Sequence, residues 1–209
     1  MKIKIIVLTI FMLLVHHGVR ASEFDNDPLV DRVIRSSWRG ATPEGLARLK
    51  QDPTQAACSQ HRNMPPAAIA ASIVERERAT ILYPESGKLA GDWRKGEKLA
   101  DSGYGGRIGA IQPDDPKRPN GGNCYACHAL DPKNPAFGNL GPSLTGYGAL
   151  RGNGAEIAKY TYDKIYNAQA VAPCSNMPRF GFHGFLSLDQ ITDLVAYLID
   201  PASPVNSQK

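Results

Sequence analysis

The run Cys124-Tyr125-Ala126-Cys127-His128 decides what kind of domain this chain of 209 residues contains. Two cysteines three positions apart, followed directly by a histidine, supply two thiols and an imidazole within one turn of chain. The thiols can add to the two vinyl groups of a haem, and the imidazole can bind its iron from one side. The pattern therefore predicts one covalently attached haem c, with His128 as an axial ligand.

The same residues have two other interpretations that the motif alone leaves open. The cysteines could form a local disulfide next to an unrelated histidine. They could also bind zinc, which takes four protein ligands in structural sites. The residues that could complete such a zinc site are Cys58, Cys174, His61 and His183.

A six-coordinate haem iron needs a second axial ligand on its other side. Beyond residue 21 the methionines are Met64 and Met177. Met177 lies 50 residues after Cys127 in a proline-flanked stretch, where packing in a core, the ordinary role of a methionine, is less expected. We expect Met177 to be the sixth ligand, with Met64, His183 and His61 as alternatives. Thioether ligation favours ferrous iron and raises the reduction potential.

Residues 1–21 have the layout of a secretory signal peptide: two lysines, an uncharged apolar run over 5–15, and the small residues Val19 and Ala21, with cleavage expected after Ala21. The apolar run is too short to cross a bilayer core about 30 Å thick, although an uncleaved anchor is the alternative. Cleavage leaves 21 basic against 20 acidic residues and lowers the net charge from +4 to +1. We expect a periplasmic protein without membrane insertion and without a nucleic-acid partner.

The remaining sequence predicts an all-α protein, because we find no strand pattern of any length and no internal repeat. Gly96 lies in the middle of one predicted helix, where glycine costs about 1 kcal/mol of helix stability relative to alanine. Close approach of another helix is one reason to tolerate that cost, and we expect it here. The expected division is a signal peptide (1–21), a helical extension (22–90) and a haem domain (91–209). The predicted helices cover 28–38, 43–50, 65–83, 92–100 with Asp92 as cap, 156–168, and a last helix from a capping box at 187–190 to Pro201.

Two cysteines, Cys58 and Cys174, remain outside the haem motif. In an exported protein, an even pair is most simply a disulfide, which would join the extension to the Met177 loop. A reactive or metal-binding thiol at Cys174 is the alternative. Three arginines are candidates for neutralising haem propionates, although we expect each to be an ordinary solvated side chain: Arg107, Arg151 and Arg179.

Over roughly residues 91–200 the arrangement resembles class I cytochrome c. The Gly96 helix and the last helix resemble the crossing pair of that family, and Met177-Pro178 resembles its sixth-ligand loop. The stretch 141–144 resembles the loop whose proline carbonyl accepts the second N–H of the proximal histidine. The resemblance implies an all-α class I cytochrome c fold with a helical N-terminal extension.

Within that superfamily the chain resembles the SoxX family, the monohaem subunits of the SoxAX cytochromes of bacterial sulfur oxidation. The resemblance implies an electron-accepting subunit of an L-cysteine S-thiosulfotransferase with no catalytic residue of its own. A SoxA-type haem subunit would hold the reactive cysteine and join thiosulfate to a SoxYZ-type carrier, and the electrons would pass to a downstream cytochrome. The matching stretches are 91–98, 121–128, 138–144, 160–167, 174–181 and 200–206.

Two rival functions remain at this stage. A stand-alone, diffusible periplasmic cytochrome c would need no partner subunit, and a haem enzyme such as a peroxidase would keep the sixth position open. The extension has two possible roles as well, contact with a partner or simple packing around the haem domain. We find no phosphate-binding loop, nucleophile elbow or isolated carboxylate pair that would indicate hydrolysis or group transfer.

Overall fold

The computed structural model describes residues 28–39, 42–106 and 114–207, and within these ranges it contains helices and no strands. The all-α prediction is therefore confirmed for the described residues. Short 3₁₀ helices (η) accompany the α-helices. In chain order the elements are α2 (Pro28–Ser37), α3 (Pro43–Ala47), α4 (Pro53–Gln60), α5 (Ala67–Arg78), α6 (Trp93–Asp101), η1 (Cys124–Ala126), α7 (Tyr147–Arg151), α8 (Ala155–Tyr166), η2 (Ala168–Ala170), α9 (Leu188–Ile199) and η3 (Pro204–Asn206).

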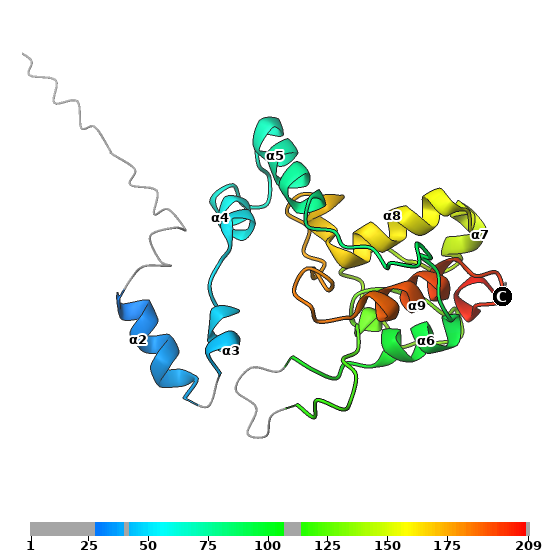
Figure 1. The fold of residues 1–209 in the computed structure, drawn as a ribbon, viewed down its shortest axis with the longest axis horizontal. Helices are drawn as coiled ribbons and strands as arrows, with labels where there is room; N and C mark the ends of the chain where they lie inside the picture. The colour runs from blue at the N-terminus through cyan, green and yellow to red at the C-terminus, as the bar shows by residue number, and fades with distance from the viewer. Residues whose placement is uncertain (1–27, 40–41, 107–113, 208–209) are drawn as a thin grey trace, which may run out of the picture.

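Helices α6 and α9 cross closely at the centre of the haem-motif half of the molecule (Figure 1). A Cβ atom at Gly96 would lie only 2.6 Å from the carbonyl carbon of Asp193 and 2.8 Å from Cβ of Tyr197. The backbone amide of Asp92, which caps α6, donates to Asp193 Oδ1 at 2.8 Å. Close approach of a second helix, predicted from Gly96 alone, is thus confirmed.

Helix α9 supplies much of the hydrophobic core. Its N-terminus has the predicted capping box, with the Ser187 hydroxyl accepting from the Gln190 amide and the Gln190 side chain accepting from the Ser187 amide. Ile191 and Val195 are fully buried and pack in one cluster with Tyr162 of α8 and with Leu130, which follows the haem motif. The core therefore joins the haem-motif segment to the two longest helices of this half.

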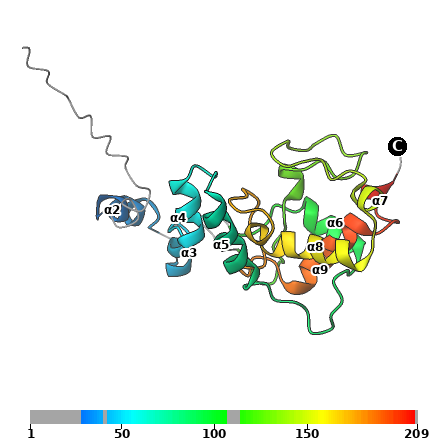
Figure 2. The same cartoon turned by 90° about the horizontal axis from the view of Figure 1, so that it is seen from above.

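The N-terminal segment packs on the same body through α4 and α5, while α2 lies apart from α6, α8 and α9 in both views (Figures 1 and 2). Helix α4 was not expected from the sequence, and α5 is shorter than the 65–83 helix that the sequence predicted. Residues after α5 also attach to α8, where the Tyr162 hydroxyl donates to the Leu82 carbonyl at 2.8 Å. The extension thus contacts the rest of the chain from α4 onward and, before α4, through Arg48, whose guanidinium donates to the Gly106 carbonyl at 2.8 Å.

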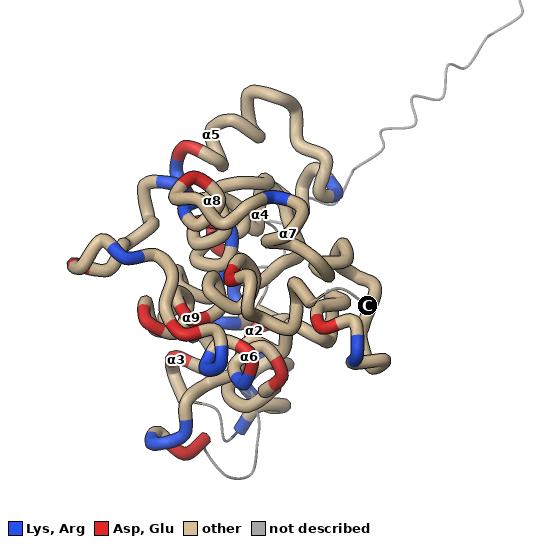
Figure 3. Tube along the Cα trace, turned by 90° about the vertical axis from the view of Figure 1, so that its right-hand side faces the viewer, with Lys and Arg blue, Asp and Glu red and all other residues tan. Residues whose placement is uncertain are grey.

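Basic and acidic positions are interspersed along the chain in the view of Figure 3, with no face of one sign. Such mixing gives no support to a nucleic-acid interface. No helix among the described residues is both long and apolar enough to span a membrane. The predicted signal peptide lies outside the described residues, and the division at residue 91 stays a prediction.

Candidate haem site

The haem motif begins at a tight turn fixed to the end of α6. Asn123 has a left-handed backbone (φ 47°), and its amide donates to the Ser102 carbonyl at 2.9 Å. The Gly122 amide donates to the Leu99 carbonyl at 2.7 Å. The His128 amide then donates to the Cys124 carbonyl at 2.9 Å and closes the turn. These bonds place both motif cysteines and the histidine on one short segment of the core.

The imidazole of His128 is oriented by a backbone carbonyl. Its Nδ1 lies 2.7 Å from the Pro142 oxygen. Because a carbonyl oxygen only accepts, Nδ1 carries the proton, and Nε2 keeps a lone pair that can bind iron. The structure thus has the proline–histidine contact that the cytochrome c resemblance implied.

The loop that carries Pro142 is fastened to the motif along its length. Amides of Gly138, Gly141 and Leu144 donate at 2.8 Å to carbonyls of the motif segment 125–129. A Cβ atom at Gly141 would lie 2.5 Å from His128 Nδ1 and 2.7 Å from Nε2. Glycine is therefore required where the loop backbone meets the flat side of the imidazole.

The four cysteines fall into two classes in the structure. Cys58 and Cys174 form a disulfide, while Cys124 and Cys127 are unpaired. The local disulfide between the motif cysteines is therefore absent. The zinc alternative also loses its two further thiolates, and no group of three His, Cys, Asp or Glu among the described residues could hold a metal ion. Burial raises the pKa of the Cys124 thiol to about 12, so it stays neutral and suits an apolar partner.

Met177 lies at the edge of the hydrophobic core, and Cys124 packs against the same core. Both side chains are partly buried and pack against the cluster around α8 and α9. Met64, by contrast, is 79% exposed in the segment after α4. His183 is exposed and lines the same cavity of about 430 Å³ as Met177, and partial desolvation of its ring together with the charge of Arg179 lowers its pKa. The high exposure of Met64 disfavours it as a ligand of a buried iron, whereas His61, the remaining alternative, is half-buried.

The expectation that Arg179 is a solvated side chain is wrong. It is 5% exposed, and its guanidinium pairs with the carboxylates of Asp52 and Glu77. Arg151 is exposed, and its guanidinium lies over the Tyr147 ring at 5.3 Å from the ring centre. Arg107 lies outside the described residues. No local sequence pattern indicates the partners of Arg179, because they lie 127 and 102 positions away.

The residues present fit a covalently bound haem. Two unpaired thiols and an imidazole with a free Nε2 share one turn, and glycine backbones line the loop beside the ring. Partly buried apolar side chains of Leu99, Leu144 and Met177 border the same core and would contact an apolar macrocycle. A further contact was not expected from the sequence: the hydroxyl of Tyr125, between the two cysteines, lies 2.8 Å from that of Tyr197 on α9.

Comparisons with known proteins agree with this site. Residues 117–200 match the family model described as Cytochrome c. A curated relative named "Uncharacterized lipoprotein", from Aquifex aeolicus (strain VF5), is 45% identical over 163 residues, which cover 75% of this chain and 73% of that protein. The crystal structure of SoxXA from P. pantotrophus is similar with a TM-score of 0.40 and 21% identity over 59% of this chain and 95% of that chain, too weakly to support a conclusion. The family match identifies a domain that binds haem c and carries electrons, and it confirms the predicted cytochrome c fold.

Proposed function

We propose that this chain, which belongs to the same protein family as the Aquifex aeolicus lipoprotein and has a cytochrome c domain at 117–200, is an exported monohaem electron carrier. The signal-peptide layout of residues 1–21 supports export to the periplasm. The relative is named as a lipoprotein, and lipoproteins are exported proteins, which also supports export. One CxxCH motif supports a single haem.

One observation carries the proposal: His128 Nδ1 bonds the Pro142 carbonyl beside two unpaired cysteines. In this proposal Cys124 and Cys127 hold the haem by thioether bonds, and His128 Nε2 and Met177 Sδ bind its iron. The haem supplies reversible one-electron chemistry. The chain attaches it, fixes the tautomer of His128, and closes the sixth position so that no substrate reaches the metal.

The finer proposal is that this carrier is the electron-accepting, SoxX-type subunit of a SoxAX-type complex. Its support is the sequence resemblance over six stretches, above all 174–181 around Met177 and 200–206 at the C-terminus, because a general cytochrome c would not share them. By that resemblance a SoxA-type haem subunit carries the reactive cysteine and a SoxYZ-type carrier receives thiosulfate. A downstream cytochrome would take the electrons from this chain.

Ligand assignment is tested on the purified ferric holoprotein. Intact mass should give the chain plus one haem, and replacement of Cys124 or Cys127 by serine should remove one covalent link. Met177→Ala should abolish the iron–sulfur absorption band of the ferric protein. A band that persists in Met177→Ala overturns the ligand assignment. Absence of the band already in the unmodified protein would also overturn this assignment, and would leave either a histidine ligand, His183 or His61, or the open sixth position of the haem-enzyme rival.

The partner is tested by affinity purification of the tagged chain from its native host, with a count of haem per complex. A stoichiometric second haem subunit supports the SoxAX-type assignment. A monomer with one haem at native expression levels refutes it and leaves the diffusible electron carrier. The two experiments are independent, because the haem ligands are measured on the isolated chain.

A further inference from the structure

Residues 174–179 form a short arch that presents Met177 between two fixed ends. The arch starts at Cys174, which has a left-handed backbone (φ 60°). The side chain of Gln169 brackets this start: its Oε1 accepts from the Cys174 amide, and its Nε2 donates to the Ser175 carbonyl at 2.9 Å. The Ser175 hydroxyl accepts from the Met177 amide at 3.2 Å. The conformation of the arch is thus specified up to Met177 itself.

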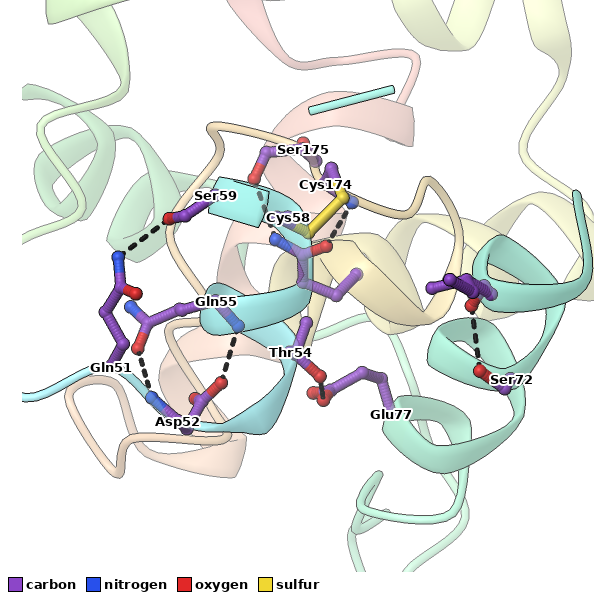
Figure 4. The surroundings of a disulfide bond; sticks show 12 residues. Gln51, Asp52, Thr54, Gln55, Cys58, Ser59, Ser72, Glu77, Cys174 and Ser175 are labelled. Atoms are coloured by element: carbon purple, nitrogen blue, oxygen red, sulfur yellow. Dashed lines mark hydrogen bonds between the residues drawn. A yellow bond between two sulfur atoms is a disulfide. The ribbon is translucent and has the colours of Figure 1, made fainter. Parts of the chain in front are cut away.

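The first end of the arch is tied covalently to helix α4. Cys174 is bonded to Cys58, 116 positions earlier in the chain, and both residues are buried (Figure 4). Met177 lies three residues after this bond. The disulfide therefore limits how far the N-terminal side of the arch can move from α4.

The second end of the arch is held by ion pairs from the same segment. Arg179, two residues after Met177, places Nη1 3.1 Å from Glu77 Oε2 of α5 and pairs through Nη2 with Asp52, the cap of α4. Arg179 is 5% exposed and Glu77 3% exposed. The planar guanidinium fork thus bridges the two helices and fixes the C-terminal side of the arch.

The carboxylate that holds Arg179 is itself held. Glu77 accepts hydrogen bonds from the hydroxyl of Thr54 and, at 2.8 Å, from the side-chain amide of Asn167, which caps η2 (Figure 4 for Thr54). Asp52 accepts from the Gln55 amide at 2.9 Å in a capping box. Both partners of Arg179 are therefore held by other residues: Asp52 by the capping box of α4, and Glu77 by Thr54 of α4 and by Asn167.

Net stability alone does not explain this arrangement. Replacing a buried ion pair or triad with apolar side chains is often neutral or stabilising, because desolvation offsets much of the attraction. A buried pair does, however, specify where a segment lies, since its geometry is narrow. Here the segment specified is the arch that carries Met177. Residues of 52–77 hold it from both sides, in addition to the bonds from Gln169.

We propose that residues 52–77 act as a clasp on the Met177 arch, with Arg179 as a positioning residue for the sixth axial ligand. The inference rests on the proposed function, in which Met177 binds the iron. Opening of the arch, which releases the methionine, requires the Arg179 ion pairs to break or the Cys58–Cys174 bond to be absent. The clasp gives residues 52–77 of the extension a role within this chain, independent of any partner.

The test measures how often the arch opens, using imidazole as an external ligand of the ferric holoprotein. Imidazole can bind the iron only where Met177 has left, so its apparent affinity scales with the open fraction. Arg179→Gln and Glu77→Gln should each raise that affinity at least tenfold. Arg179→Lys keeps the charge without the planar fork, so its imidazole affinity should lie between those of the unmodified protein and Arg179→Gln. Reduction of the disulfide in the unmodified protein, followed by alkylation of the two thiols and reoxidation of the iron to the ferric state, should raise it as well, which provides a reading even where a variant fails to fold.

The matched control is Lys159→Gln. Lys159 pairs with Asp163 at 2.6 Å and bonds the Tyr83 hydroxyl, so this variant also breaks a contact between the extension and the haem domain, away from the arch. Its imidazole affinity should stay within twofold of the unmodified protein. If Arg179→Gln and Lys159→Gln change the imidazole affinity equally, the clasp is overturned. If Met177→Ala abolishes the iron–sulfur band in the same experiments, the ligand assignment stays intact. A band that survives Met177→Ala overturns both.

Discussion

At the scale of single residues, the orientation of His128 depends on the absence of a side chain at position 141. Gly141→Ala would put a methyl group 2.5 Å from His128 Nδ1, so the ring or the loop must move and the bond to Pro142 is lost. We expect the free energy of unfolding of the holoprotein to fall by about 2 kcal/mol. Denaturant unfolding measures the loss, and the ferric absorption spectrum reports the altered histidine.

Gly154→Ala is the matched control for that prediction. Gly154 has φ −72°, and a Cβ atom there meets nothing within 4 Å. Since Gly154 caps α8, the variant should lose less than about 1 kcal/mol through the weaker cap and leave the haem spectrum unchanged. Equal losses in the two variants would refute the steric role assigned to Gly141.

The hydroxyl pair Tyr125–Tyr197 makes a second residue-level prediction. The two oxygens lie 2.8 Å apart and join the haem motif to α9, and the Asp131 amide also donates to Tyr125 at 3.3 Å. Tyr125→Phe and Tyr197→Phe should each cost about 1 kcal/mol. The double variant should cost little more than one of them, because both remove the same bond. Additive losses in this double-mutant cycle would contradict the direct interaction.

At the scale of elements, the α6–α9 crossing depends on Gly96. A methyl group there would lie 2.6 Å from the Asp193 carbonyl carbon, which is backbone and cannot rotate away. Although alanine gains up to about 1 kcal/mol in helix propensity, we expect Gly96→Ala to lose about 3 kcal/mol net through overpacking. Chemical denaturation checks this against Lys95→Ala, an exposed position on the same helix that should change little. A stabilised Gly96→Ala would contradict the close crossing.

Elements whose boundaries carry local signals could be predicted from the sequence. The bounds of α9 and α6 were predicted almost to the residue from three signals: the capping box at Ser187, the cap at Asp92 and the terminating Pro201. Helix α4 was missed, because between Pro53 and Gln60 it has small or polar residues and no periodic run of large apolar ones. Its one local signal was the Asp52-Pro-Thr-Gln55 capping box, which the structure contains.

At the scale of the whole molecule, contacts of the candidate site could be predicted where the two partners are close in the sequence, and could not where they are far apart. The motif residues lie within five positions, and the Pro142 contact of His128 spans 14. The partners of Arg179 span 102 and 127, and no local pattern indicates which carboxylates a distant arginine will meet. Burial of Arg179 was therefore predicted wrongly, although both carboxylates were visible in the sequence.

The same long-range contacts make the molecule sensitive to acid. Burial raises the pKa of both Asp52 and Glu77, but hydrogen bonds and the charge of Arg179 outweigh it, so each pKa lies below its ordinary value. A folded-state pKa below the unfolded one means that the unfolded chain binds more protons in acid. These carboxylates therefore add stability fully above the ordinary carboxyl pKa of about 4, and the contribution is lost as the pH falls through the folded-state pKa.

Glu77→Gln isolates this contribution, because glutamine keeps the shape and removes the charge that faces Arg179 and Arg76. At pH 7 the variant should lose about 3 kcal/mol of unfolding free energy, since Arg179 stays buried with only Asp52 as a charged partner. Denaturant unfolding at pH 7, 5, 4 and about 3 follows the difference. The gap between the two proteins should narrow below about pH 4, because the unfolded chain of the unmodified protein takes up a proton at Glu77 before the folded protein does. A gap that stays constant down to pH 3 would mean that the loss does not come from the charge of Glu77, and the absence of a gap at pH 7 would mean that only its shape matters.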